Sequence, residues 1–200
     1  MIEQSQSYDY VIVGAGSAGS ALANRLTADG KYSVLLLEAG PADKSPWIHI
    51  PLGYAKLFTN PTYNWCFHTE AEPGTAGRET LYPRGKTLGG SSSINGLLYL
   101  RGHPEDYDHW AELGNRGWAW GDVLPYFVKG EANVRGADAF HGADGEIGVS
   151  DVNVRHELAD AFIESCVQAG IPRNEDFNGA SQEGAGYYQF TTWRGRRSST

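Results

Sequence analysis

The chain has 200 residues, 40% of them hydrophobic and 20% charged, which is enough for one folded domain or two small ones. Its 24 acidic and 16 basic residues give a formal net charge of −8, which argues against nucleic-acid binding and against docking on an anionic membrane. The sequence has no apolar run long enough for a transmembrane helix, and its polar first residues do not resemble a signal peptide. Cys66 and Cys166 have no metal-binding spacing. We therefore expect a cytoplasmic protein without a metal site.

The first part of the chain predicts a βαβ unit over residues 8–38. Residues 8–13 form an apolar run that ends in glycine, as a buried parallel strand does. Apolar residues at helical spacing follow, up to a glycine at position 30, and residues 33–38 form a second apolar run. A strand, a helix and a strand within about 30 residues indicate an α/β, Rossmann-like fold.

The turn between the first strand and the helix reads GAGSAG and is a candidate phosphate-binding loop. Gly14 permits a tight turn, Gly16 lets a pyrophosphate approach the backbone, and Gly19 lets the helix pack closely on the strand. The amides of Ser17 and Ala18 at the start of the helix are placed to bind a phosphate. A glycine-rich turn without a ligand is the alternative.

An acidic residue follows the second strand. Glu38 comes about 20 residues after the last glycine of the turn, where a carboxylate accepts hydrogen bonds from both ribose hydroxyls of a dinucleotide. Because a carboxylate repels a 2′-phosphate, NADP is disfavoured. We place the neighbouring Ala39 at the same site.

Residues 85–95, GKTLGGSSSIN, form a second glycine-rich motif. The paired glycines and three serines predict another turn rich in backbone donors, opening a helix, and Asn95 can donate to or accept from a polar heterocycle. A nicotinamide cofactor has no need of a second cradle, whereas a larger cofactor with a tricyclic ring does. A capped helix after a tight turn, without a ligand, is the alternative.

Residues 40–83 lack clear periodicity and predict a long excursion that serves a ligand. We expect further helices at residues 104–113, 121–131 and 156–169, and strands at residues 147–149 and 187–192. We expect core or interface packing for the aromatic residues Trp110, Trp118, Trp120, Tyr126 and Phe127. His103 and His109 are expected at the surface. The last three residues are helix-start formers with no helix after them, so we expect a truncated chain.

The two glycine-rich motifs, with EAG after the second strand and the run GLLYLRGHPEDYD that completes residues 85–108, resemble the glucose–methanol–choline (GMC) oxidoreductases, choline dehydrogenase-like branch. The resemblance implies FAD as cofactor, oxidation of an alcohol with hydride transfer to flavin N5, and a catalytic base near the end of a much longer chain. No residue of this chain matches that base, so no catalytic residue is assigned.

The resemblance also implies a set of cofactor-binding residues. Gly14, Gly16 and Gly19 hold the pyrophosphate, Glu38 binds the ribose, and Trp65 lies near the cofactor. The second motif supplies the diphosphate and flavin side with Arg84, Gly85, Leu88, Gly89, Gly90, Ser91, Ser92, Ser93, Asn95 and Gly96. Some members carry a flavin-linked histidine where this chain has Ile94, which has no nucleophilic atom, so we expect non-covalent FAD.

Together these patterns predict the N-terminal part of a FAD-binding domain over residues 1–200, with the second motif at 84–108 and a helix-and-strand segment at 109–200. The rest of the FAD domain and the substrate domain are expected to be absent. The expected partners are a small alcohol and an electron acceptor that is either oxygen or a quinone-type molecule. Two other hypotheses are a FAD-binding fragment without turnover and a nicotinamide-dependent dehydrogenase, which the second glycine-rich motif argues against.

Overall fold

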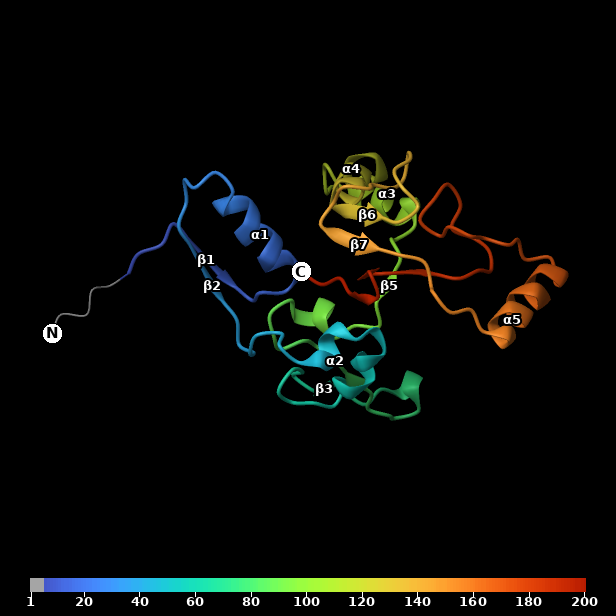
Figure 1. The fold of residues 1–200 in the computed structure, drawn as a ribbon, viewed down its shortest axis with the longest axis horizontal. Coiled ribbons are helices and arrows are strands. Elements are labelled where there is room, and N and C mark those ends of the chain that lie inside the picture. Colours follow the sequence, from blue (N-terminus) through green and yellow to red (C-terminus); the bar gives the residue numbers. More distant parts are fainter. Residues whose placement is uncertain (1–5) are drawn as a thin grey trace. The chain divides into compact units, whose positions relative to one another are not determined.

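The computed structural model describes residues 6–200, which form two compact units (Figure 1). Unit 1 comprises residues 6–96 together with Gly195–Thr200, and unit 2 comprises Leu97–Arg194. The boundary divides the predicted motif of residues 84–108: its glycine- and serine-rich part, up to Gly96, belongs to unit 1 with the excursion before it, and the rest belongs to unit 2.

Unit 1 begins with the predicted βαβ unit. Strands β1 (Tyr10–Val13) and β2 (Val34–Leu37) pair in parallel, with Tyr10 opposite Val34 and Val13 opposite Leu37. Helix α1 (Ser17–Thr27) connects them and lies beside both strands in Figure 1. The prediction of buried strands is wrong, because no residue of β1 or β2 is fully buried, and Val11 and Val13 are 58% and 84% exposed. The Ile12 side chain faces α1, where a Cβ on Gly19 would lie 3.2 Å from it.

The excursion of residues 40–83 contains short elements around a small apolar core. Its elements are α2 (Pro46–His49), the 3₁₀ helices η1 (Pro51–Lys56) and η2 (Pro73–Thr75), and the antiparallel pair β3 (Phe67–His68) and β4 (Leu81–Tyr82). Ile48 and Leu57 from this segment pack with Ile94 of the second motif, and all three are buried. The excursion is therefore held to the second motif by apolar contact.

The second motif forms one 3₁₀ turn, η3 (Gly90–Ser93), where the sequence predicted the opening of a longer helix. Gly89 and Gly90 have φ of +83° and +55°, so the chain enters the turn in the left-handed region, which glycine adopts readily. The hydroxyls of Ser92 and Ser93 donate backwards to the carbonyls of Gly89 and Leu88. Since these hydroxyls satisfy preceding carbonyls, they do not cap a following helix.

Unit 2 contains the predicted helices and strands with small shifts at their ends. The helices are α3 (Pro104–Glu112), α4 (Trp120–Gly130) and α5 (Glu157–Gln168). Strand β5 (Leu98–Tyr99) pairs antiparallel with β8 (Gln189–Phe190), and β6 (Glu131–Asn133) pairs in parallel with β7 (Ile147–Val149). The single strand predicted at residues 187–192 is instead divided into β8 and β9 (Thr192–Trp193). Strand β10 (Arg196–Arg197) belongs to unit 1.

Helices α3 and α4 pack through aromatic side chains. Tyr107 contacts Trp110, Trp120 and Phe127 with ring centroids 5.5–5.8 Å apart, and Trp110 also contacts Trp118. The prediction of packed aromatics is therefore confirmed as ring contacts for the tryptophans and Phe127, although Trp110 and Trp118 are also 46% and 50% exposed. It is wrong for Tyr126, which is 75% exposed. No helix among residues 6–200 is long and apolar enough to span a membrane.

Candidate functional site

The first glycine-rich turn has the geometry that its sequence predicts. Gly14 has φ +97° and donates its N–H to the Leu37 carbonyl at 2.7 Å, which joins the turn to β2. A Cβ on Gly19 would lie 1.9 Å from the Gly14 carbonyl oxygen, so glycine is required for α1 to pack here. Gly16 precedes α1, and no side chain caps this helix end. The first amides of α1 are thus available for an anionic group.

The two glycine-rich turns lie against each other. The Gly89 N–H donates to the Ala15 carbonyl at 2.8 Å, and Gly16 and Gly89 form a parallel β-bridge. A Cβ on Gly90 would lie 2.8 Å from the Cα of Gly16. Side chains at this contact would separate the turns, so the glycines allow two backbone segments that are distant in sequence to form one surface.

Glu38 joins this surface from the end of β2. One carboxylate oxygen accepts the Ala15 N–H and the other accepts the Gly40 N–H, both at 2.9 Å. A carboxylate has about four acceptor sites, so two sites remain for other donors. Glu38 therefore shapes the first turn and still presents negative charge beside it.

These segments line one cavity of about 530 Å³. Eight of the predicted cofactor residues line it: Gly14, Gly16, Glu38, Ala39, Trp65, Gly85, Gly90 and Ser91. Val13 and Leu37 complete the lining. The other predicted residues lie outside it: Ser17, Ala18, Gly19, Arg84, Leu88, Gly89, Ser92, Ser93, Asn95 and Gly96.

Trp65 gives the cavity an aromatic surface. Its ring stacks on that of Phe67 with centroids 5.9 Å apart, and the Lys86 ammonium lies 4.8 Å from the Trp65 ring. The Trp65 residue is 45% exposed although it contacts both of these neighbours. An oriented, partly exposed aromatic ring beside a glycine-rich cradle suits a flat heterocycle.

Sequence reasoning missed Asn64, which organises the segment next to this ring. Asn64 is buried, donates to the Phe58 carbonyl at 2.6 Å, and accepts the N–H groups of Cys66 and Arg84 at 2.9 Å. The Arg84 guanidinium lies 3.9 Å above the Tyr82 ring. Nothing in the local pattern distinguishes this asparagine from an exposed turn residue. The one indication in the sequence was its position directly before Trp65, a predicted cofactor residue.

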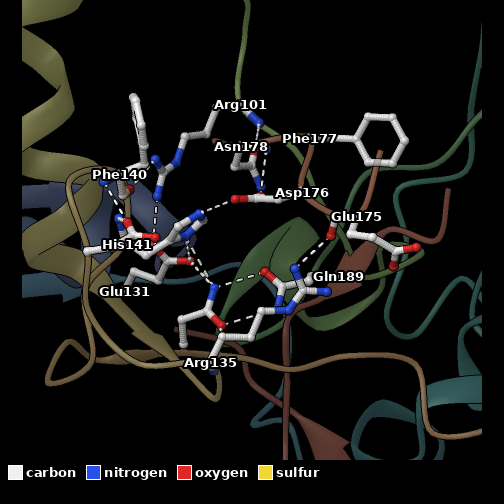
Figure 2. Close-up of polar contacts among 12 residues, drawn as sticks. Arg101, Glu131, Arg135, Phe140, His141, Glu175, Asp176, Phe177, Asn178 and Gln189 are labelled. Atoms are coloured by element: carbon white, nitrogen blue, oxygen red, sulfur yellow. Dashed lines mark hydrogen bonds and ion pairs between the residues drawn. The ribbon is translucent and has the colours of Figure 1, made fainter. Parts of the chain in front are cut away.

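Unit 2 contains a second polar cluster, which Figure 2 shows around Glu131. Glu131 accepts from Arg101 Nη2 at 2.7 Å and from His141 Nδ1 at 3.0 Å, and the other His141 nitrogen lies 2.9 Å from Asp176. Asn133 links Glu131 to Gln189 through its amide. The members are Arg101, Glu131, Asn133, His141, Asp176 and Gln189, and we call them the Glu131 cluster.

The geometry of the Glu131 cluster requires a charged histidine. Since ionised carboxylates only accept, both ring nitrogens of His141 must carry hydrogen. The hydrogen bond with Glu131 raises the pKa of His141, burial opposes this, and the bond with Asp176 adds to the rise. Burial raises the pKa of Glu131, but bonds from His141 and Asn133 outweigh it, so the pKa is lowered overall. An imidazolium held in this way is a structural cation and has no lone pair to act as a base.

Within residues 6–200 no group of His, Cys, Asp and Glu side chains is arranged to hold a metal ion. His103 is exposed and accepts the Glu105 N–H at the start of α3, as its predicted surface position implies. The cavity in unit 1 is therefore the candidate site, and its chemistry is that of a cradle for an extended, negatively charged ligand.

Comparison with known proteins agrees with this geometry. The model of the GMC oxidoreductase family matches residues 8–200. Oxygen-dependent choline dehydrogenase from Sinorhizobium fredii is 49% identical over 189 residues, which cover 94% of this chain and 34% of that protein. The chain thus spans about a third of the length of the curated relatives it matches.

Solved structures show the same fold. Pyridoxine 4-oxidase from Mesorbium loti superimposes with a TM-score of 0.90 at 39% identity, covering 96% of this chain and 38% of that one. A FAD-dependent oxidoreductase from Chaetomium thermophilum gives 0.85 at 29% identity, covering 96% and 35%. These likenesses confirm the predicted α/β fold class, and the match of the family model over residues 8–200 shows that the chain belongs to the GMC oxidoreductases.

Proposed function

We propose that this chain is the FAD-binding portion of an oxidoreductase that acts on the CH–OH group of an alcohol. One observation carries the proposal: the two glycine-rich turns contact each other and, with Glu38, line a single cavity. A nicotinamide dinucleotide needs only the first of these turns, whereas FAD has a larger ring system to be held by a second one.

The residues of the cavity fit FAD. Gly16 has open space where a side chain would stand, apart from Gly90 Cα at 3.8 Å, so a pyrophosphate can approach its backbone. Glu38 has acceptor sites left for ribose hydroxyls. Gly85, Gly90 and Ser91 of the second motif and the Trp65 ring form the remaining surface, where we place the flavin side.

When bound, FAD supplies the acceptor for the hydride that leaves the carbinol carbon. The residues of this chain bind and orient the cofactor and keep its pyrophosphate on the backbone amides. We assign His141 no role as a general base, because two carboxylates hold it as a cation.

We propose that the cofactor is bound without a covalent link. Ile94, at the position where some family members carry a flavin-linked histidine, is 2% exposed and packs with Ile48 and Leu57. Its side chain offers no nucleophilic atom.

For the substrate we propose a primary alcohol. Choline and pyridoxine, which the names of the two relatives mention, are both primary alcohols. Both oxygen and a quinone-type molecule stay open as electron acceptor.

Flavin content and its response to alcohols test the proposal. The protein, purified in the longest form that its gene encodes, should show flavin absorption, and choline or pyridoxine should bleach it in the absence of oxygen. Gly16→Val should remove the flavin, because its side chain would occupy the pyrophosphate position. Gly121→Ala, at a glycine with open space around it, should retain the flavin.

A wild-type protein without flavin, or stoichiometric flavin in Gly16→Val, would refute the cofactor site. Bound flavin that no primary alcohol reduces would leave the cofactor site intact and refute the proposed substrate class.

A further inference from the structure

Glu38 uses both of its carboxylate oxygens within the fold of unit 1. Oε2 accepts the Ala15 N–H and Oε1 accepts the Gly40 N–H, both at 2.9 Å. The carboxylate thus joins the first glycine-rich turn to the chain that leaves β2. Each of these two segments also contacts the second glycine-rich motif, so Glu38 is connected to that motif by two routes.

The first route runs through Ala15. This residue is 1% exposed, and its carbonyl accepts the Gly89 N–H at 2.8 Å. Gly16, the next residue, forms the β-bridge with Gly89. Because Glu38 binds the Ala15 N–H, it helps to hold the turn in the position in which this carbonyl meets the second motif.

The second route runs through Gly40 and Pro41. A Cβ on Gly40 would overlap the Lys86 carbonyl oxygen, so the two backbones are in direct contact. The Pro41 carbonyl accepts the Thr87 hydroxyl at 2.8 Å, and Thr87 is fully buried. Because Glu38 binds the Gly40 N–H, it also helps to hold this contact in place.

Both routes end within residues 86–89 of the second motif. Gly85, just before these residues, and Gly90 and Ser91, just after them, line the unit 1 cavity, as Glu38 itself does. In the proposed function this is the surface of the flavin side. The carboxylate can therefore act on the flavin side through the backbone, in addition to the ribose contact that its remaining acceptor sites permit.

We propose that Glu38 is a positioning residue for the flavin side of the cofactor, acting through Ala15 and Gly40 on the second glycine-rich motif. The proposal rests on the proposed function and goes beyond the ribose contact that the family resemblance implies. An ionised carboxylate suits this task because it only accepts, so both oxygens can bind a backbone N–H. Such charge-assisted bonds are stronger than neutral ones and hold the cradle in shape before the cofactor binds.

Glu38→Gln tests this role in the flavin-binding protein, purified in the longest form that its gene encodes. Glutamine has the same size but one acceptor oxygen, and its NH₂ group would face one of the two backbone N–H groups. We expect the Kd for FAD to rise at least about tenfold, the loss of one charge-assisted bond. Glu79→Gln, at an exposed glutamate of unit 1, is the matched control and should leave the Kd unchanged.

The visible spectrum at saturating FAD separates positioning from ribose binding. The ribose is separated from the ring by the pyrophosphate, so the loss of a ribose contact alone would raise the Kd and leave the flavin bands of the saturated protein unchanged. In Glu38→Gln we expect shifted bands even at saturation, because the surface around the ring has moved.

Thr87 gives a second test that leaves every ribose contact in place. Thr87→Val removes the hydroxyl bond to Pro41 at nearly constant volume, whereas Thr87→Ser keeps a hydroxyl. We expect Thr87→Val to raise the Kd for FAD about two- to tenfold and to shift the flavin bands, and Thr87→Ser to restore most of both. In the Glu38→Gln background Thr87→Val should have a smaller effect, because both changes act on the same route.

Wild-type flavin bands in saturated Glu38→Gln, or additive effects of the two variants on the Kd, would overturn the inference and leave Glu38 with the ribose contact alone. The Thr87 pair also decides the matter if Glu38→Gln does not fold or cannot be saturated. Wild-type bands in Thr87→Val would then overturn the inference. A wild-type protein without flavin would instead refute the proposed function.

Discussion

Replacing Glu131 with glutamine should destabilise unit 2 by about 3–5 kcal/mol, as expected when one member of a buried ion pair is removed. The Glu131 side chain is fully buried and receives hydrogen bonds from Arg101 and His141, both of which carry charge. In the glutamine variant the only carboxylate left in the cluster is Asp176, which is 33% exposed. Arg101 would then have no carboxylate partner in the cluster, and His141 would keep only Asp176.

The magnitude agrees with a count of the bonds. Arg101 and His141 each form a charge-assisted bond with Glu131, at 2.7 and 3.0 Å, and the Asn133 amide donates at 2.9 Å. A charge-assisted bond contributes about 1.5–3 kcal/mol. Glutamine keeps one oxygen as acceptor but turns its NH₂ group toward a donor. One charged contact therefore loses its acceptor and the other loses the opposite charge, which agrees with a loss of about 3–5 kcal/mol.

Urea unfolding followed by tryptophan fluorescence measures this loss, because Trp110, Trp118 and Trp120 all lie in unit 2. Glu164→Gln is the matched control, since its ion pair with Arg173 is exposed and should contribute less than about 1 kcal/mol. If Glu131→Gln destabilises the unit no more than this control does, the Glu131 cluster is not the stabilising centre that its geometry indicates.

Three further measurements test the two units. Gly19→Ala should cost about 1–3 kcal/mol in free energy of unfolding, because its Cβ would meet the Gly14 carbonyl oxygen, while Gly121→Ala should be neutral or slightly stabilising; equal effects in both variants would contradict the packing argument. The melting temperature of unit 2 should be highest between about pH 4.5 and 6.5. The raised pKa of His141 gives stability that is full below its ordinary value of 6.5 and is lost as pH rises through the folded value. The lowered pKa of Glu131 gives stability that is present above 4.5 and is lost as pH falls through the folded value. His141→Gln should flatten the alkaline decline, and an unchanged profile would show that His141 is not the titrating group. Acid precipitation should leave the flavin in the supernatant, because Ile94 cannot form a covalent link; yellow precipitated protein would show a covalent bond.

The βαβ unit was predictable because short-range patterns determine it. Apolar runs, a glycine after each, and a helical stripe between them specify β1, α1 and β2 without reference to other segments. The second motif was recognised for the same reason, but its helix was not found. The Ser92 and Ser93 hydroxyls donate to preceding carbonyls. Whether a serine hydroxyl caps a following helix or bonds to a preceding carbonyl depends on backbone φ angles, which the sequence does not specify.

The polar interior was not predictable, because its partners are distant in sequence. Arg101, Glu131 and His141 come from separate elements of unit 2, and each alone is typical of a surface residue. The buried apolar residues of the described part of this unit are Leu97, Val149, Ile163 and Ala185, whereas its buried polar or charged residues are Arg101, Glu131, Asn133, His141, Asn174, Asn178 and Gln189. A search for hydrophobic periodicity therefore finds the helices of this unit but does not find the buried polar residues of the Glu131 cluster.

Both units bury one arginine, and the difference between the two arginines leads to opposite expectations. Arg101 faces a carboxylate, so removing the negative charge of Glu131 should weaken unit 2. Arg197 faces only carbonyl and amide oxygens, so adding a negative charge at Asn95 should not weaken unit 1. Arg101, whose charge Glu131 neutralises within unit 2, contributes to the stability of that unit. The function is placed in unit 1 on other grounds, because the two glycine-rich turns and Glu38 line one cavity there.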